Sequence, residues 1–307
     1  MDLNGRSSSR TSVVLPAERE LHDPNESIFD QGLAFDLTTL MDRRQVIKLI
    51  GSAGVAAGVF TIFGCTPGAL LSSASTAASA AGSTAGSTAT TGSAASCDPI
   101  PEETAGPFPG DGSNGPDVLA QSGVVRKDIR SSFGSASGVA AGVPLTINLT
   151  IQDETNGCAP LAGAAVYLWH CDQDGAYSLY SQGVTDENYL RGVQAADSNG
   201  LVTFTSIFPA CYSGRWPHIH FDVYPSLAKA TDQGNKIATS QIALPKDICD
   251  AVYATDGYSQ SVTNLARVSL ASDNVFGDDG GVHELGTISG SVAAGLTVAL
   301  AVPVKTA

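Results

Sequence analysis

The chain has 307 residues and a formal net charge of −14, and its acidic residues are scattered rather than grouped in blocks. This charge favours solubility and argues against a nucleic-acid partner, because the chain has no basic patch that could neutralise phosphates. Composition changes sharply along the chain, so we expect only the part after about residue 97 to fold.

Residues 1–65 have the features of an export leader. After a polar start, Asp42-Arg-Arg-Gln-Val-Ile-Lys48 leads into a glycine- and alanine-rich apolar run that ends near Phe63. This pattern resembles a twin-arginine export signal, and the run is too short for a membrane span. Ile62-Phe-Gly-Cys65 resembles a lipoprotein cleavage box, in which Cys65 would be lipidated and tether the protein to a membrane. We therefore expect an exported protein in the cell envelope or outside the cell. The sequence leaves open whether Cys65 is an ordinary cysteine and whether Met41 is the true start.

Residues 66–96 consist almost wholly of Ala, Ser, Thr and Gly and carry no charge. Such a tract has too little apolar bulk to offset the entropy lost on ordering. We expect a flexible linker between the leader and a domain at residues 97–307.

The predicted strands follow one another through this domain. Apolar residues alternate with polar ones, or cluster, at residues 145–151, 165–170, 201–205, 218–224 and 295–302. Turn signals at residues 153–157, 197–200 and 278–281 separate them, and residues 245–253 are the best helix candidate. The expected fold class is all-β, an antiparallel β-sandwich with long loops and little helix.

Five cysteines follow the linker, and they have no Cys-x-x-Cys spacing. Zinc-ribbon and thioredoxin-like interpretations therefore lose their main support. Export would place these cysteines in an oxidising space where disulfides persist, yet an odd number leaves at least one thiol outside an internal pair. The sequence leaves the pairing open among Cys97, Cys158, Cys171, Cys211 and Cys249.

The segment Arg215-Trp-Pro-His-Ile-His220 is the strongest candidate for a site. Side chains at i and i+2 of a strand point to the same face, so His218 and His220 could hold one metal between them. Taken alone, the pair could equally be a polar surface pair, because a short motif is weak support.

Two tyrosines precede these histidines and strengthen the metal hypothesis. Tyr177 lies where a strand runs out into an Asp-Gly turn, and Tyr212 lies in the loop before the histidine strand. Phenolate oxygens are hard ligands, so two tyrosines with two histidines favour Fe(III) over zinc. A trivalent cation would also ionise phenols at neutral pH.

Several ordered segments carry a family resemblance: Trp169-His-Cys with Gly175-Ala-Tyr177, Asn188-Tyr-Leu-Arg-Gly192, Asp197-Ser-Asn-Gly200, Phe204-Thr-Ser-Ile-Phe-Pro209 and Tyr212-Ser-Gly-Arg-Trp-Pro-His-Ile-His220. Together they resemble the intradiol ring-cleavage dioxygenases, the family of catechol 1,2- and protocatechuate 3,4-dioxygenase, and especially its exported single-domain members. Upstream, Glu102-Glu-Thr-Ala-Gly-Pro-Phe108 and Val125-Arg-Lys-Asp-Ile-Arg130 fit the same pattern, so the resemblance covers roughly residues 97–307.

This resemblance implies an oxidoreductase with a non-haem Fe(III) cofactor. Tyr177, Tyr212, His218 and His220 would be the metal ligands, with Tyr177 remaining bound and Tyr212 displaced by substrate to relay a proton. Arg215 would stabilise negative charge on the bound ring. The implied reaction cleaves a catechol-type ring between its two hydroxylated carbons with O2, giving a cis,cis-muconate-type product. No nicotinamide or flavin would be needed.

Two departures from the family pattern leave substrate and oligomeric state open: the segment from Tyr212 to His218 is short, and no helical amino-terminal dimerisation domain is present. The alternative is a tethered, non-catalytic β-sandwich module similar to prealbumin and carboxypeptidase-regulatory domains. Among the other aromatic residues, we expect Trp169 in the core and Trp216 in a pocket wall. We expect His170 to be satisfied locally and His283 to face solvent.

Overall fold

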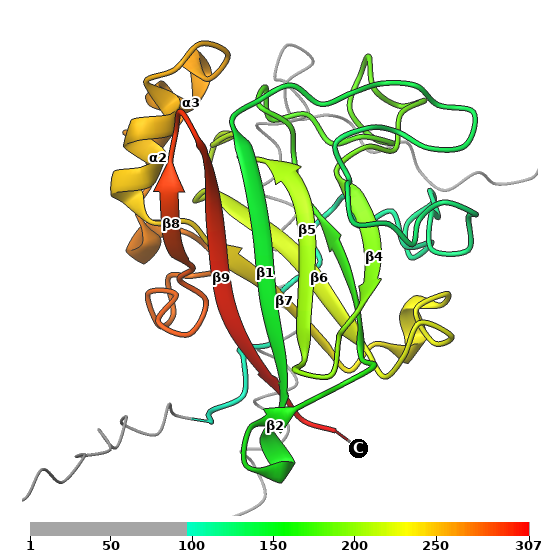
Figure 1. Ribbon diagram of the computed structural model, residues 1–307. Coiled ribbons are helices and arrows are strands. Elements are labelled where there is room, and N and C mark those ends of the chain that lie inside the picture. Colours follow the sequence, from blue (N-terminus) through cyan, green and yellow to red (C-terminus); the bar gives the residue numbers. More distant parts are fainter. Residues whose placement is uncertain (1–96, 307) are drawn as a thin grey trace, which may run out of the picture.

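The computed structural model describes residues 97–306 (Figure 1). Its strands are β1 (Pro144–Asp153), β2 (Ala159–Pro160), β3 (Ala165–Trp169), β4 (Arg191–Ala195), β5 (Leu201–Ile207), β6 (His218–Tyr224), β7 (Ala238–Ala243), β8 (Thr287–Ser291) and β9 (Gly295–Val304). The helices are α2 (Lys246–Tyr253) and α3 (Ser259–Leu265), with short 3-10 turns at Glu154–Asn156, Gln233–Asn235 and Leu270–Ser272. The prediction of a mostly β fold with little helix is confirmed.

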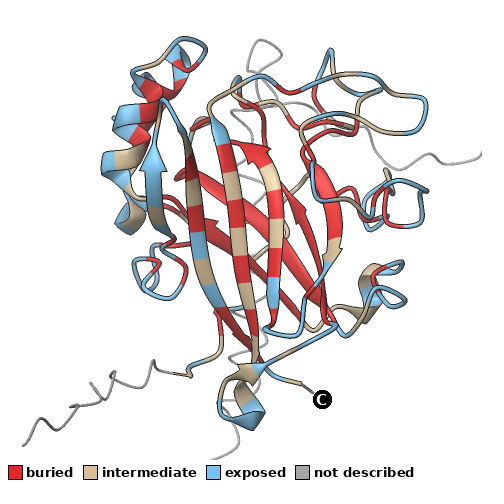
Figure 2. Ribbon diagram, viewed as in Figure 1, coloured by how far each residue is buried: buried red, intermediate tan, exposed pale blue. Residues whose placement is uncertain are grey.

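The strands form two sheets that share one hydrophobic core. One sheet has the order β2-β1-β9-β8 with β5 also paired to β1, and the other has the order β4-β3-β6-β7. Leu145, Ile147 and Leu149 of β1 belong to the same buried cluster as Ile219 and Phe221 of β6. Figure 2 shows the resulting alternation of buried and less buried residues along β1.

Strand β6 differs from β1 because all seven of its residues are buried. Its odd-numbered residues enter the shared core, so the even-numbered residues lie on the opposite face of the sheet. Irregular segments of the chain cover that opposite face. The fold thus keeps a row of polar side chains out of water, which is the condition for an enclosed site.

Strand direction is the detail in which the structure differs from the prediction. Most pairs are antiparallel, but β1 and β9 run parallel from Leu145↔Leu296 to Asp153↔Val304. Strand β9 lies at the end of the chain, where it follows β8 in an antiparallel pair, and it is far from β1 in the sequence. No tight hairpin joins β1 to β9, so these two strands are free to pair in parallel.

The helix predicted at residues 245–253 is confirmed as α2, with Cys249 and Val252 buried. Helix α3 was not predicted, because its sequence SQSVTNL carries few apolar residues. No helix within residues 97–306 is both long enough and apolar enough to cross a membrane.

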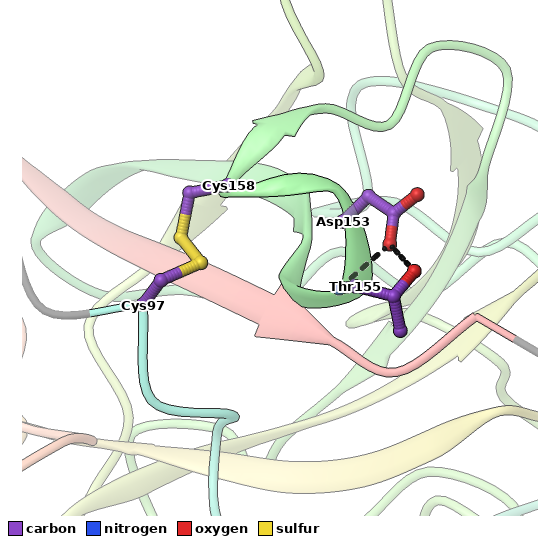
Figure 3. Close-up of a disulfide and its surroundings, with 4 residues drawn as sticks. All are labelled: Cys97, Asp153, Thr155 and Cys158. Atoms are coloured by element: carbon purple, nitrogen blue, oxygen red, sulfur yellow. Dashed lines mark hydrogen bonds between the residues drawn. A yellow bond between two sulfur atoms is a disulfide. The ribbon is translucent and has the colours of Figure 1, made fainter.

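One disulfide joins Cys97 to Cys158, with Cα atoms 5.7 Å apart (Figure 3). It links the first described residue to the turn after β1, where Asp153 caps a 3-10 turn by accepting from Thr155. Cys171, Cys211 and Cys249 are free and buried, in line with the odd count of cysteines. The predicted leader with its twin-arginine-like pattern, the cleavage box at Cys65 and the linker lie outside the described residues.

Candidate metal centre

Strand β6 places the two candidate histidines on one face of its sheet. His220 pairs with Trp169 of β3 on one side and with Gln241 of β7 on the other. The Nε2 atoms of His218 and His220 lie 3.1 Å apart, and both side chains are buried. Metal–nitrogen bonds of about 2 Å allow two ligands of one metal to approach within about 3 Å, so this spacing suits a shared cation.

The imidazole of His218 has a defined orientation and tautomer. Its Nδ1 lies 2.5 Å from the carbonyl oxygen of Trp216, which can only accept a hydrogen bond. Nδ1 therefore carries the proton, and the lone pair of Nε2 points toward the site. His220 is oriented by stacking on Trp169, with ring centroids 5.0 Å apart and planes 3° from parallel.

The loop before β6 brings Tyr212 to the same place. Its hydroxyl lies 3.1 Å from His218 Nε2, so the phenol donates to the imidazole lone pair. The backbone of neighbouring Cys211 is fixed on both sides, because its N–H donates to Ser261 Oγ (3.0 Å) and its carbonyl accepts from Asn264 (2.8 Å). Tyr212 is only half-buried, which leaves its side chain more room to move than the histidines have.

Tyr177 completes the group from the loop after β3. Its ring centroid lies 5.9 Å from that of Tyr212 and 6.4 Å from that of His220. The residue is 1% exposed, and its hydroxyl makes no hydrogen bond with the rest of the described chain. A buried phenol without a partner carries a cost of about 1–3 kcal/mol, which a bound cation would remove.

Burial controls the protonation of these groups. Desolvation raises the pKa of Tyr177 well above its usual value, with a further contribution from Tyr212. Desolvation also lowers the pKa of both histidines well below the usual value; Arg215 adds to the effect at His218, and His218 adds to it at His220. The imidazoles are therefore neutral electron-pair donors at neutral pH, whereas Tyr177 keeps its proton until a cation is bound.

Arg215 lies beside the histidines and is 1% exposed. Its Nε donates to Asp273 Oδ2 at 3.0 Å, and its Nη2 donates to Gln241 Oε1 at 2.7 Å. The Asp273 carboxylate also accepts from the backbone N–H of Trp216. The guanidinium is thus a buried cation with a fixed orientation, and its field contributes to the low pKa of His218.

A segment at the start of the domain covers the site, and we call residues 102–110 the strap. The backbone N–H of Glu103 bonds to Thr239 in β7, and Gln241 Nε2 donates to the Thr104 carbonyl at 2.9 Å. Gly106 approaches His220 so closely that a Cβ there would lie 3.3 Å from the imidazole Cε1. Phe108 packs against Tyr177 with ring centroids 4.9 Å apart.

The donor set fits a ferric ion better than a zinc site. Within residues 97–306, no three His, Cys, Asp or Glu side chains gather into a metal-binding group, so a metal here would need the tyrosines as ligands. Two phenol oxygens and two imidazole nitrogens are a hard set that suits Fe(III). The unpartnered hydroxyl of Tyr177 adds a donor already out of water.

The structure brings together all the residues that the sequence singled out for the site: Tyr177, Tyr212, Arg215, His218 and His220. His170 bonds instead to Ser206 Oγ and its neighbour's carbonyl, whereas His283 is exposed, as predicted for both. Trp169 and Trp216 are buried. Sequence reasoning missed Gln241 and Asp273, and only the pairing of β7 beside β6 could have pointed to Gln241.

Comparisons with known proteins indicate which family the chain resembles. A family model described as a dioxygenase matches residues 114–230, a range that contains the five predicted site residues. A chlorocatechol 1,2-dioxygenase from Rhodococcus opacus is 37% identical over 59 residues, which are 19% of this chain and 23% of that protein. The chain thus matches less than a quarter of the length of this relative.

Solved structures extend the likeness over the whole described domain. An intradiol ring-cleavage dioxygenase from Tetranychus urticae superimposes with a TM-score of 0.55 and 25% identity, over 68% of this chain and 95% of that one. A second solved dioxygenase gives a TM-score of 0.54 at 24% identity, over 68% of this chain and 95% of that one. The family model covers the predicted site residues and the fold matches over the whole described domain, so this chain is similar to the intradiol ring-cleavage dioxygenases.

Proposed function

We propose that the domain is a non-haem Fe(III)-dependent dioxygenase that opens a catechol-type ring between its two hydroxylated carbons. Both atoms of O2 enter the product, a cis,cis-muconate-type dicarboxylate, so the reaction balances without an external reductant. One observation carries the proposal: the hydroxyl of Tyr212 and the Nε2 atoms of both histidines converge within 3.1 Å contacts, beside the unpartnered hydroxyl of Tyr177.

Each residue has a role that follows from its surroundings. When bound, a ferric ion would supply the charge that holds a catecholate and makes its ring reactive toward O2. Tyr177, His218 and His220 are buried and would remain as permanent ligands. Half-buried Tyr212 would be the ligand that gives way to substrate, and its phenolate oxygen would then accept a catechol proton.

Arg215 stabilises negative charge on the bound ring. Its guanidinium is already desolvated and oriented by Asp273 and Gln241, so little reorganisation is needed when the substrate becomes more anionic. A lysine would not replace it, because one ammonium group cannot make the same fixed, planar set of hydrogen bonds.

The non-catalytic β-sandwich module is the less favoured function. A binding module of that kind has no need for four buried or half-buried donor groups around one point, and the family match covers those residues. Localisation is a separate proposal: we infer that the domain acts outside the cytoplasm, attached through residues 66–96. The leader pattern and the Cys97–Cys158 disulfide support this proposal, and thiol counting in cells tests it.

Colour and oxygen uptake test the proposed chemistry. Purified protein reconstituted with iron is expected to show a red-brown phenolate-to-iron absorption band and to consume O2 with a panel of catechols. Tyr177→Phe and His220→Ala are each expected to remove the band and the uptake. Tyr224→Phe is the control, because Tyr224 is a buried tyrosine on the same strand whose hydroxyl has only a 3.5 Å contact with Asp222.

Two results would count against the proposal. A wild-type protein that stays colourless and inactive after reconstitution would favour the non-catalytic module. Oxygen uptake that survived Tyr177→Phe at the wild-type rate would instead show that the ligand assignment is wrong.

A further inference from the structure

Arg191 is a buried cation that lies outside the predicted ligand set. It is 1% exposed, and within the described chain it forms no ion pair. A buried guanidinium is costly unless its N–H groups are satisfied, and arginine has five of them. The segment Asn188–Gly192, in which it lies, matched the family pattern without receiving a role.

All five N–H groups of Arg191 donate hydrogen bonds, and each acceptor is a neutral oxygen. Nε donates to Ser178 Oγ (3.0 Å), and Nη2 donates to the carbonyls of Phe108 (2.9 Å) and Ser178 (2.9 Å). Nη1 donates to the Pro109 carbonyl (2.7 Å) and to Tyr167 Oη (3.1 Å). One side chain thus joins the strap to the loop that carries Tyr177.

Both joined segments determine where Tyr177 lies. Ser178 follows Tyr177 directly in the chain, and Phe108 of the strap packs on the Tyr177 ring. The Tyr177 hydroxyl has no hydrogen bond that could orient it. The ring position therefore depends on its backbone and on the rings packed around it, among which Phe108 has the shortest centroid distance, and Arg191 holds both that backbone and Phe108.

Backbone strain on both sides of the contact supports this function. Leu179, directly after Ser178, has φ 74°, and Leu190, directly before Arg191, has φ 56°. A residue other than glycine in this left-handed region costs about 1 kcal/mol or more, and it persists only where neighbouring contacts enforce it. Space is also tight, since a Cβ on Gly110 would lie 2.7 Å from Arg191 Nη1.

We propose that Arg191 is the positioning residue for the Tyr177 ligand: it clamps the strap and the Tyr177 loop together and so sets the place of the phenol oxygen. This inference rests on the proposed function, because the ligand role of Tyr177 belongs to it. Arg191 itself forms no hydrogen bond with any of the four proposed ligand side chains.

The test compares Arg191→Lys with Arg126→Lys. Arg126 also donates to backbone carbonyls, those of Ser131, Asn188 and Arg191, but it hydrogen-bonds to neither the strap nor the Tyr177 loop. In the metal-free protein, Arg191→Lys is expected to speed hydrogen exchange about tenfold at residues 104–110 and 177–181, with little change in Arg126→Lys. In the iron-loaded protein, Arg191→Lys is expected to shift and weaken the phenolate band and to lower kcat more than it raises KM.

A second variant with a smaller change keeps the proposal testable if Arg191→Lys does not fold. Ser178→Ala removes the Nε acceptor and keeps the other four hydrogen bonds of Arg191, so a smaller band shift in the same direction is expected. Wild-type exchange and wild-type colour in Arg191→Lys would overturn the proposal. If wild-type protein itself never becomes coloured, the proposed function fails, whereas the metal-free exchange experiment still decides whether the clamp exists.

Discussion

At the level of single residues, Arg215 and Asp273 show how a positive charge is held inside the protein. The carboxylate of Asp273 accepts from Arg215 and from the backbone N–H of Trp216 with one oxygen, and from the N–H groups of Val275 and Phe276 with the other. Both side chains are at most 1% exposed. Burial of both charges has a large desolvation cost, and the hydrogen bonds of the pair give the guanidinium a fixed geometry.

Asp273→Asn is expected to lower the free energy of unfolding by about 3–5 kcal/mol, because it removes the buried carboxylate that pairs with the Arg215 guanidinium. Catalytic rate is expected to fall as well, since the guanidinium loses part of its orientation. Urea unfolding measures the first effect, and oxygen uptake with catechol measures the second. Asp128→Asn is the matched control: it breaks the exposed pair with Arg130, which is worth about 0–1 kcal/mol. Equal losses of stability in the two variants would contradict the role given to Asp273.

The sequence predicted only part of this site at the residue level. His218 and His220 follow from alternation in a strand, Tyr177 and Tyr212 are predicted as hard ligands that complete the set, and family resemblance gives Arg215 its role. Asp273 could not be found, because its contact with Arg215 spans 58 residues and depends on where an irregular loop folds. A carboxylate in a loop carries no pattern that distinguishes a buried partner from a solvated one.

At the level of elements, the strap is the part of the site with the least regular structure. It is held at several points by hydrogen bonds to β7 and to Arg191, and Gly106 lies against His220. Gly106 has φ +68°, which L side chains rarely adopt. The close approach and the backbone conformation therefore both call for glycine at this position.

Gly106→Ala is expected to displace the imidazole of His220 and so to shift the phenolate band and lower oxygen uptake. Gly134→Ala separates this contact from the backbone effect, because Gly134 has φ +70° and no atom near its Cβ position. Both variants are expected to lose about 1 kcal/mol of stability from the strained backbone, measured by denaturant unfolding. If Gly134→Ala changed the iron spectrum as much as Gly106→Ala, contact with His220 would not be the cause.

The strands that the sequence predicted are those whose apolar residues alternate or cluster, such as β1, β6 and β9. Strand β7 was missed because it buries Thr239, Ser240 and Gln241, which look like solvent-facing residues in a sequence. Strand β8 was missed for the opposite reason, since it is mostly exposed and contains glycine and serine. In both cases neighbouring elements, rather than local preference, decide the structure.

At the level of the whole molecule, the Cys97–Cys158 disulfide fastens the start of the folded domain to the turn after β1 (Figure 3). It closes a loop with a sequence separation of 61 residues, for which chain entropy predicts a stabilisation of about 4 kcal/mol. The strap begins a few residues after Cys97, so the same bond limits how far the strap can move. Pairing could not be predicted, because cysteine spacing alone does not determine which thiols meet.

The oxidation state of Cys97 and Cys158 in cells also indicates the compartment in which the protein folds. A chain exported to an oxidising space is expected to keep only the thiols of Cys171, Cys211 and Cys249, because Cys97 and Cys158 are paired and lipidation would block Cys65. A chain with Arg43→Lys and Arg44→Lys is expected to stay in the cytoplasm, where disulfides are rare, and to expose all six cysteines. Mass-tagging of thiols in denatured cell extracts counts them directly.

The contribution of the disulfide to stability can be measured separately from the thiol count that tests export. The double variant Cys97→Ser, Cys158→Ser is expected to be exported and tagged at three sites like the parent, yet to unfold about 4 kcal/mol more easily. The parent is expected to match the double variant after reduction. Six tagged thiols in the parent chain, with the arginine pair intact, would contradict both export and the lipidation of Cys65, because a reduced Cys97–Cys158 pair and a free Cys65 belong to a protein that never left the cytoplasm.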